Sequence, residues 1–365
     1  MKNESISERQ ATLLIIFFLL GSSLLLGSGN EAKQDVWLAI IIAISWSIIL
    51  LLMYSRILSL YPGKDLFDIL QIVMGKFLGK IICILMIWFA FHDGTLVLRN
   101  LSEFTNTLVF SETPVIVPLL FFTILLIWSL KAGIEVSGRW AELFSWVIFS
   151  IILIVPVLSI SQMDISRLKP ILNNGVTPLL KGAFSSFSFP FGETVVFTMV
   201  FSNISKIKNY KKIFMVGLFA GGGLILLTSL RNLLVLGSET VSRLYFHSTM
   251  SVSLIKLGTL QRLESTVIIV FLVCVFIKIC ICIFAVCNGL SKVFGFDDYK
   301  FIATPIALLM LSFSFFIYKS TMEMAFWASN IFPYYSFPFE VIIPLIIFIV
   351  AEIRNRRSTN TILIK

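Results

Sequence analysis

The sequence predicts an all-α integral membrane protein of about ten transmembrane helices, two of which are broken. The first observation behind this class is composition: of the 365 residues, 58% are hydrophobic and only 13% are charged, and the mean hydropathy is +0.96. Soluble domains of this length are far more polar. The apolar segments follow one another from end to end, so we expect a single transmembrane domain over residues 1–365 in the cell membrane.

The second observation is the length and number of these segments. A spanning helix needs roughly 20 apolar residues, and ten segments satisfy this requirement. They cover about residues 10–29, 36–55, 80–105, 114–131, 141–160, 183–202, 212–237, 264–288, 301–319 and 333–353. The segment 63–75 is shorter and more polar, which predicts an amphipathic helix at the membrane interface.

The positive charges predict the orientation of the chain. With the N-terminus inside, eighteen of the 29 Lys and Arg residues fall in inner loops and eight in outer loops. Cytoplasmic loops of membrane proteins carry an excess of Lys and Arg, so we expect both termini, including the basic tail 354–365, in the cytoplasm. The same rule explains the net charge of +9 without nucleic acid, which we do not expect as a partner.

The third observation is that two segments contain residues that interrupt helices. The first segment carries Gly21, Ser22 and Ser23, and glycine lowers helix stability by about 1 kcal/mol relative to alanine. Close helix packing through small residues is the alternative explanation there. The sixth segment is stronger evidence for a functional break than the first. Proline removes a backbone hydrogen-bond donor, and a carboxylate within a span is usually functional. The segment contains Phe189, Pro190, Phe191, Gly192, Glu193 and Thr194.

The two interruptions lie five helices apart, which predicts a five-plus-five inverted-repeat transporter fold with broken helices 1 and 6. Repeat one covers about 10–160 and repeat two about 183–353. Corresponding breaks in two halves of a chain are typical of this fold, whose ligand site lies near the middle of the membrane. Helix ends and exposed amides there suit a small zwitterion such as an amino acid. We therefore expect the nine residues of the two breaks to bind the ligand.

Other polar residues inside the spans are candidates for ion pairing or coupling. His92, Arg99 and Glu103 are spaced to share one helical face. Lys278 lies near the centre of the eighth segment, where it could pair with a carboxylate or occupy a cation position; snorkelling to the interface is the alternative. Arg231, nearer the end of its segment, is able to snorkel outward, and we assign it no role.

No pattern in the sequence is typical of an enzyme. There is no nucleophile elbow, phosphate-binding glycine loop or metal-ligand quartet, and two histidines are too few for a histidine-rich metal site. We expect no catalytic residues, no metal and no cofactor. The five cysteines lie in apolar segments, where they are expected to pack as small apolar side chains.

Several motifs together resemble the B subunits of spore-germination nutrient receptors, a family similar to the amino acid–polyamine–organocation transporters. The motifs are Ile6-Ser7-x-x-Gln10 before Gly21-Ser22, then Phe189-Pro190-Phe191-Gly192-Glu193, Leu260-Gln261-Arg262-Leu263-Glu264, Phe332-Pro333, Pro344 and the basic run Arg354-Asn355-Arg356-Arg357. The resemblance covers essentially the whole chain.

The resemblance implies a germinant receptor subunit in the inner membrane of a bacterial spore. Such a subunit binds a small nutrient, often an amino acid, and works with a membrane-anchored A subunit and a lipoprotein C subunit to trigger germination. Two alternatives remain open. One is a proton-coupled amino-acid transporter in which Lys278 or Glu193 handles charge, and the other is an ion-conducting subunit of the same complex.

Overall fold

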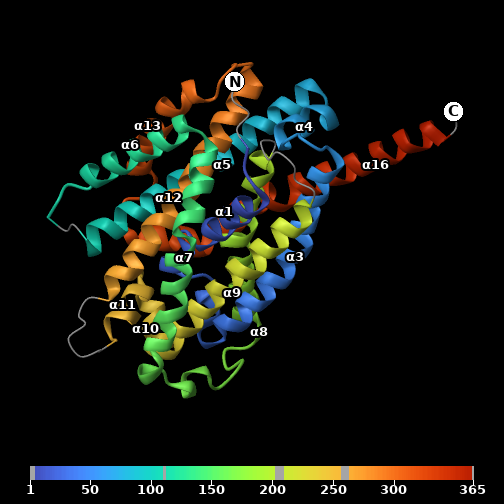
Figure 1. The fold of residues 1–365 in the computed structure, drawn as a ribbon. Helices are drawn as coiled ribbons and strands as arrows, with labels where there is room; N and C mark the ends of the chain where they lie inside the picture. Colours follow the sequence, from blue (N-terminus) through green and yellow to red (C-terminus); the bar gives the residue numbers. More distant parts are fainter. Residues whose placement is uncertain (1–4, 110–111, 202–208, 256–262, 364–365) are drawn as a thin grey trace.

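The computed structural model describes residues 5–109, 112–201, 209–255 and 263–363, and the regular secondary structure in these ranges is entirely helical (Figure 1). The longest helices are α3 (Val36–Leu60), α5 (Lys76–Leu108), α6 (Ile116–Ala132), α7 (Ile134–Leu158), α9 (Tyr210–Leu236), α12 (Glu264–Phe294), α13 (Lys300–Ile317) and α16 (Ile343–Leu363). The shorter α-helices are α1 (Glu8–Leu20), α2 (Ser23–Leu26), α4 (Leu66–Met74), α8 (Val176–Ser186), α10 (Ser238–Arg243), α11 (His247–Ser253), α14 (Thr321–Phe326) and α15 (Phe332–Phe337). The 3₁₀-helices are η1 (Asn30–Asp35), η2 (Ile160–Gln162), η3 (Ile165–Leu168) and η5 (Gly192–Met199), and the π-helical turns are η4 (Phe187–Phe191), η7 (Trp327–Ile331) and η8 (Pro338–Ile342).

Seven continuous helical stretches in the described residues are long and apolar enough to cross a membrane. They are Asn30–Leu60, Lys76–Leu108, Ile134–Leu158, Tyr210–Leu236, Glu264–Phe294, Lys300–Ile317 and Thr321–Arg356. An eighth apolar helix, Ile116–Ala132, is slightly shorter. These eight stretches correspond to eight of the ten predicted segments. The other two predicted segments, 10–29 and 183–202, are those that carry the interruptions.

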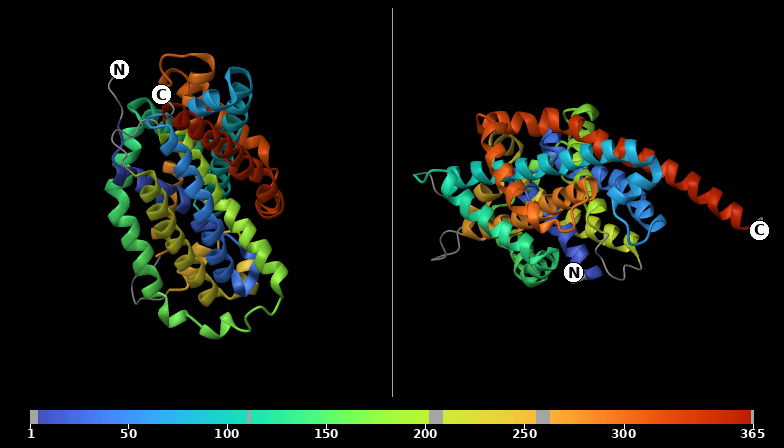
Figure 2. Two further views of the ribbon diagram at one scale, coloured as in Figure 1. Left: turned by 90° about the vertical axis from the view of Figure 1, so that its right-hand side faces the viewer. Right: turned by 90° about the horizontal axis from the view of Figure 1, so that it is seen from above.

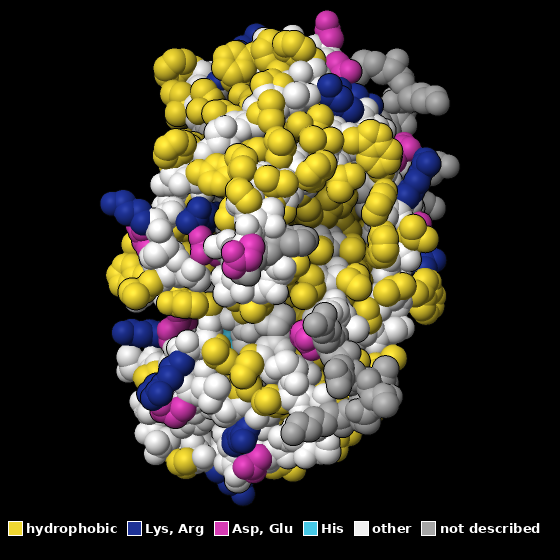
Figure 3. Space-filling view, turned by 90° about the vertical axis from the view of Figure 1, so that its left-hand side faces the viewer, with side chains coloured by type: hydrophobic (Ala, Val, Ile, Leu, Met, Phe, Trp, Pro, Cys, Tyr) yellow, Lys and Arg dark blue, Asp and Glu magenta, His cyan; other side chains and the backbone are white. Residues whose placement is uncertain are grey.

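Large apolar side chains cover much of the outer surface. Trp146 and Phe121 are 73% and 67% exposed, and Figure 3 shows a broad area of apolar side chains in the upper half of one face. An exposed apolar surface of this extent is unfavourable in water and favourable in lipid. It agrees with the multi-pass membrane protein that the composition predicts.

Helix α1 lies in the interior of the bundle. Its N-terminus is fixed by a capping box, in which Ser7 accepts from the Gln10 main-chain N–H and the Gln10 side chain accepts from that of Ser7. Nine of its residues between Ala11 and Leu20 are buried, where α7, α9 and α12 surround them. A helix that is apolar on all sides is stable only when it is enclosed in this way.

The first interruption follows directly. Helix α1 ends at Leu20, Gly21 has non-helical dihedral angles, and the single turn α2 follows before the chain changes direction. Gly27 and Gly29 have φ values of 70° and 72°, which L-residues with a side chain rarely adopt. Glycine at these two positions therefore lets the chain turn from α2 into η1 and α3.

The second interruption lies between α8 and η5. The helical pattern changes to the π-helical turn η4, within which Phe189 is extended with φ −117° and ψ 114°. Pro190 follows and cannot donate a backbone hydrogen bond. The chain then continues as the 3₁₀-helix η5 from Gly192. Both interrupted segments lie inside the bundle, where α3 packs against η4 and η5 and α1 contacts both.

Helix α4 and the C-terminal helix α16 complete this outline of the described fold. The segment predicted as interfacial forms α4, whose apolar side packs on α5 and α16. Helix α16 continues through the basic tail to Leu363 and projects beyond the bundle (Figures 1 and 2). The start of α1 and the end of α16 lie toward the same end of the bundle in these views.

Candidate functional site

A cavity of about 380 Å³ lies between the two interruptions. The first interruption contributes Ser28 and Gly29, and the second contributes Phe189 and Glu193. Helix α5 supplies one side through Asp93 and its neighbours, while α10, α14 and η7 close the others. Sites for small molecules usually measure roughly 300–1,000 Å³, so the cavity is of a size to hold a small ligand.

The lining of the cavity combines polar and apolar groups. Carboxylates come from Asp93, Glu193 and Glu31, and Asn100 adds an amide. The apolar wall is built from Leu96, Val97, Phe189, Tyr318, Met324, Trp327 and Phe332. An apolar wall with a few convergent polar groups is the usual pattern of a small-molecule site.

Lys278 pairs with two of the lining carboxylates and contacts both interruptions. Its side chain is fully buried, and its Nζ lies 2.5 Å from Glu193 Oε2 and 3.8 Å from Asp93 Oδ1. The same ammonium stands over the rings of Phe18 and Phe189, at 4.8 and 5.1 Å from their centroids. The sequence left open whether Lys278 pairs with a carboxylate, occupies a cation position or snorkels to the interface. In the structure Lys278 pairs with a carboxylate and does not snorkel. A buried charge of this kind is tolerated because it is paired.

The glycine of the first interruption makes room for this lysine. A Cβ atom on Gly21 would lie 2.9 Å from Lys278 Cδ and 3.0 Å from the Phe18 main-chain oxygen. The aliphatic part of Lys278 therefore crosses the α1–α2 junction, while its ammonium reaches Glu193 in the second interruption. One side chain from α12 thus contacts both breaks.

The glycine of the second interruption faces a carboxyl group that the sequence interpretation missed. A Cβ on Gly192 would lie 2.3 Å from Glu340 Oε2, and the Glu340 side chain is fully buried. The Tyr54 hydroxyl donates to the Glu340 main-chain oxygen at 2.5 Å and lies 3.5 Å from that of Gly192. Asp93, 1% exposed, was missed as well. Both are acids within apolar segments, and that signal alone could have identified them.

The nine residues predicted to bind the ligand do not all reach the cavity. Phe189 and Glu193 line it. The other seven are buried behind it and shape the two breaks, and they are Gly21, Ser22, Ser23, Pro190, Phe191, Gly192 and Thr194. A direct ligand contact from these seven stays a prediction.

The three residues predicted to share one face of α5 make two different kinds of contact. Arg99 pairs with Glu103 at 2.7 Å, and Glu103 also accepts from the Thr321 hydroxyl at 2.5 Å. His92 instead lies among aromatic rings, with centroids 5.7 Å from Trp88 and 5.0 Å from Tyr335. The ion pair with Lys278 comes from Asp93, the residue next to His92.

Arg231 does not snorkel outward. It is 4% exposed and donates to Asn232 at 2.6 Å and to Ser251 at 3.1 Å. Asn232 donates to Ser248, whose hydroxyl in turn donates to the Leu24 main-chain oxygen. The arginine therefore belongs to a polar network that supports α2, the single helical turn within the first interruption.

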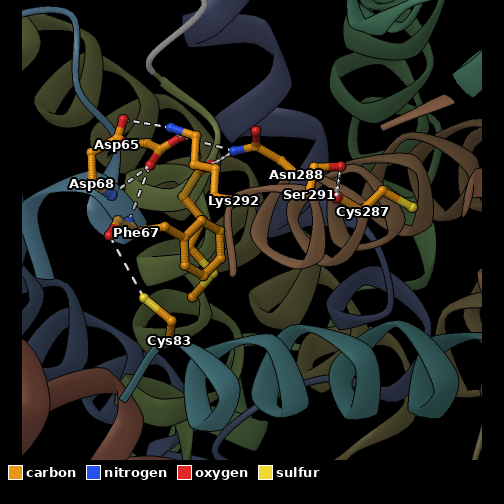
Figure 4. Close-up of polar contacts among 9 residues, drawn as sticks. Asp65, Phe67, Asp68, Cys83, Cys287, Asn288, Ser291 and Lys292 are labelled. Carbon is orange, nitrogen blue, oxygen red and sulfur yellow. Dashed lines mark hydrogen bonds and ion pairs between the residues drawn. The ribbon is translucent and has the colours of Figure 1, made fainter. Parts of the chain in front are cut away.

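A second polar cluster ties α4 to the end of α12 (Figure 4). Asp65 caps α4 by accepting from the main-chain N–H groups of Phe67 and Asp68. Its other oxygen lies 2.6 Å from Lys292 Nζ and 2.8 Å from Asn288 Nδ2. Burial raises the pKa of the Asp65 carboxyl above its ordinary value, and the Lys292 ammonium opposes the shift.

The two roles of Asp65 are separable by substitution. Asp65→Ala is expected to lower the free energy of unfolding by about 2–3 kcal/mol, since it removes a helix cap worth about 1 kcal/mol and charge-assisted hydrogen bonds. Asp65→Asn keeps a good cap and removes only the charge, so its loss is smaller. Thermal unfolding measures the stability of both variants. Alkylation of the buried Cys83 measures loosening of α4, because its Sγ lies 3.6 Å from the Phe67 main-chain oxygen. Equal stability of Asp65→Ala and the unsubstituted protein would contradict the assignment.

The arrangement of these helices defines the class of the protein. Mhp1, a nucleobase-cation-symport-1 family transporter solved in a closed conformation with bromovinylhydantoin bound, matches 92% of this chain and 79% of its own, with a TM-score of 0.66. The two sequences are 11% identical, so the match establishes the fold alone. The chain is an all-helical membrane protein with a transporter fold.

The chain belongs to the spore germination protein family, whose family model matches residues 5–323. Spore germination protein KB of Bacillus subtilis (strain 168) is 30% identical over 366 residues, which cover 99% of this chain and 98% of that protein. Spore germination protein YndE of the same organism is 22% identical and covers 79% and 81%. The family resemblance predicted from the sequence is confirmed, and neither this family nor Mhp1 is an enzyme.

Proposed function

We propose that the chain is the B-type subunit of a nutrient germinant receptor and binds a small nutrient, most simply an amino acid, in the cavity. The observation that carries the proposal is that both interruptions border one cavity, through Ser28 and Gly29 on one side and Phe189 and Glu193 on the other. Family membership supports the germination role, and the transporter fold supports a site between broken helices.

The polar and apolar groups of the lining suit the three parts of an amino acid, which are its ammonium group, its carboxylate and its side chain. Asp93 and Glu193 would face the ammonium group. Ser28 Oγ, which has no hydrogen-bond partner among the described residues, would donate to the carboxylate beside the non-helical turn at Gly29. The aromatic wall around Phe332 would hold the side chain of the ligand.

The proposal includes the membrane arrangement predicted from the sequence. The chain would form five-plus-five inverted repeats with ten spans and broken helices 1 and 6, and the site would lie near mid-membrane. Both termini would be cytoplasmic, which agrees with α1 starting and α16 ending toward one end of the bundle. In the inner membrane of the spore the subunit would act with an A subunit and a lipoprotein C subunit.

Deletion of the gene tests this function. Spores that lack the protein are expected to stop germinating with one nutrient and to germinate normally with others, because only the site for that nutrient is lost. The twenty amino acids and common sugars are supplied singly, and the fall in optical density is measured. Complementation restores the response. Normal germination with every nutrient, in a strain that also lacks related B subunits, contradicts the proposal.

The fold also favours a second function, proton-coupled transport of the amino acid. Mhp1 is a transporter, and the buried Lys278–Glu193 pair is able to handle charge. Purified protein in liposomes with an imposed proton gradient distinguishes the two functions, using the amino acid that the deletion strain fails to sense. Binding without accumulation supports the receptor, and gradient-driven accumulation supports the transporter.

A further inference from the structure

We propose that Glu340 is a proton-binding site, whose carboxyl group is held in its neutral, protonated form against Gly192 in the second interruption. Glu340 lies in the π-helical turn η8, within the apolar stretch Thr321–Arg356. Its side chain is fully buried, and neither carboxyl oxygen has a hydrogen-bond partner of normal geometry among the described residues, although the Ser336 hydroxyl lies close enough to interact with the carboxyl group. Burial of an ionised carboxylate without partners is strongly unfavourable, and binding of a proton removes that penalty.

The groups that face Glu340 from neighbouring elements cannot neutralise it. They are Tyr54 of α3, Asp93 of α5, Glu193 of η5 and Lys278 of α12, with Ser336 on the preceding turn of its own chain segment. Three carboxyl groups therefore share one ammonium group.

The Lys278 ammonium group and the Tyr54 hydroxyl make their contacts with groups other than the Glu340 carboxyl group. Lys278 makes its ion pairs with Glu193 and Asp93, and the Tyr54 hydroxyl donates to the Glu340 main-chain oxygen. The described residues also include no cluster of acids, histidines or cysteines arranged to hold a metal ion. Uptake of one proton from the aqueous solvent converts the Glu340 carboxylate to a neutral carboxylic acid, so Glu340 needs no counter-charge and the Lys278 ammonium group is left to Glu193 and Asp93.

The contact with Gly192 links this proton to the shape of the second interruption. The position of a Cβ on Gly192 is only 2.3 Å from one Glu340 oxygen and 3.0 Å from the other. No water molecule fits between the backbone of η5 and the carboxyl group. Separation of η5 from η8 would admit water and let the acid ionise. The proton site stands on this geometry alone and does not depend on which ligand the cavity takes.

Infrared spectroscopy of the purified protein in lipid nanodiscs tests the site directly. At neutral pH the unsubstituted protein is expected to show the carbonyl band of a protonated carboxylic acid, and Glu340→Gln is expected to lose it. Glu193→Gln and the exposed control Glu323→Gln should retain it. A missing band in the unsubstituted protein overturns the proposal, and so does a band that persists in Glu340→Gln or disappears only in Glu193→Gln.

The pH dependence of stability provides a second test. The folded protein keeps a proton that the unfolded chain releases above its ordinary glutamate pKa, so rising pH favours unfolding by up to about tenfold in the equilibrium constant per pH unit. Glutamine resembles the protonated acid and carries no such proton. Glu340→Gln should therefore fold, and its melting temperature should rise relative to that of the unsubstituted protein as the pH rises above about 5. A Glu340→Gln protein that does not fold, or a difference that does not change with pH, overturns the proposal.

Discussion

Replacement of Lys278 by methionine is expected to destabilise the protein by about 3–5 kcal/mol and to abolish its ligand response. Methionine has a similar length but no charge, so Glu193 loses the partner that lies 2.5 Å away and Asp93 loses the ammonium group that lies 3.8 Å away. Removal of one member of a buried ion pair costs this much because the other charge stays buried and uncompensated. The midpoint of thermal unfolding, followed for purified protein in detergent, measures the change.

A compensating substitution separates the lost ion pair from a general packing defect. Lys278→Met combined with Glu193→Gln removes both charges, and we expect it to recover at least half of the lost stability. Lys211→Met, at an exposed position near the start of α9, is the matched control and should leave the midpoint unchanged. If the double variant is as unstable as Lys278→Met or less stable, the pair is not the reason for the loss.

The spans and interruptions were accessible to prediction because they depend on local chemistry. Runs of apolar residues identify helices that lipid can surround, and the change at Pro190 to Gly192 follows from a missing donor and a missing side chain. The boundaries were less accurate. The third span was predicted at 80–105 and covers Lys76–Leu108, since its polar ends are part of the helix and composition does not mark where it stops.

The partners of the buried charges could not be predicted in the same way. Lys278 was a candidate for pairing from its central position, but the identity of its partners depends on which faces of α5, η5 and α12 meet. Asp93 and Glu340 lie on segments far apart in the sequence, and only packing brings them to Glu193. The prediction that Arg231 is able to snorkel outward is wrong, because nothing in its own segment shows that α11 packs against α9.

The two interruptions are held together by contacts that leave no room for added atoms. The space that a side chain on Gly21 would need is filled by the Lys278 side chain. The corresponding space beside Gly192 is filled by the carboxyl group of Glu340. The same four residues therefore set the spacing of α1, η5, α12 and η8. Lys278 also pairs with Glu193, which lines the cavity. A ligand that binds to Glu193 and weakens this ion pair would therefore affect both interruptions.

A bulky side chain in place of Gly192 is expected to abolish the ligand response, as Lys278→Met does. A methyl group at this position would stand 2.3 Å from Glu340 Oε2 and 2.5 Å from its carboxyl carbon, and Glu340 is fully buried. Overpacking of this kind costs about 1–3 kcal/mol, so we expect Gly192→Ala to fold with reduced stability and a weakened response. Gly192→Leu should abolish the response while the protein still inserts into the membrane. Germination assays of spores and immunoblots of their membranes measure the two properties.

Gly223 provides the matched control, because it is a helical glycine on α9 with no atom within 4 Å of an added Cβ. Gly223→Leu should therefore insert and respond normally. Glu340→Ala creates space opposite Gly192, so the pair Gly192→Ala with Glu340→Ala should melt at a higher temperature than Gly192→Ala alone. A normal response from Gly192→Leu would place the ligand site away from the second interruption. A pair that melts no higher than Gly192→Ala would show that the added methyl group does not act through Glu340.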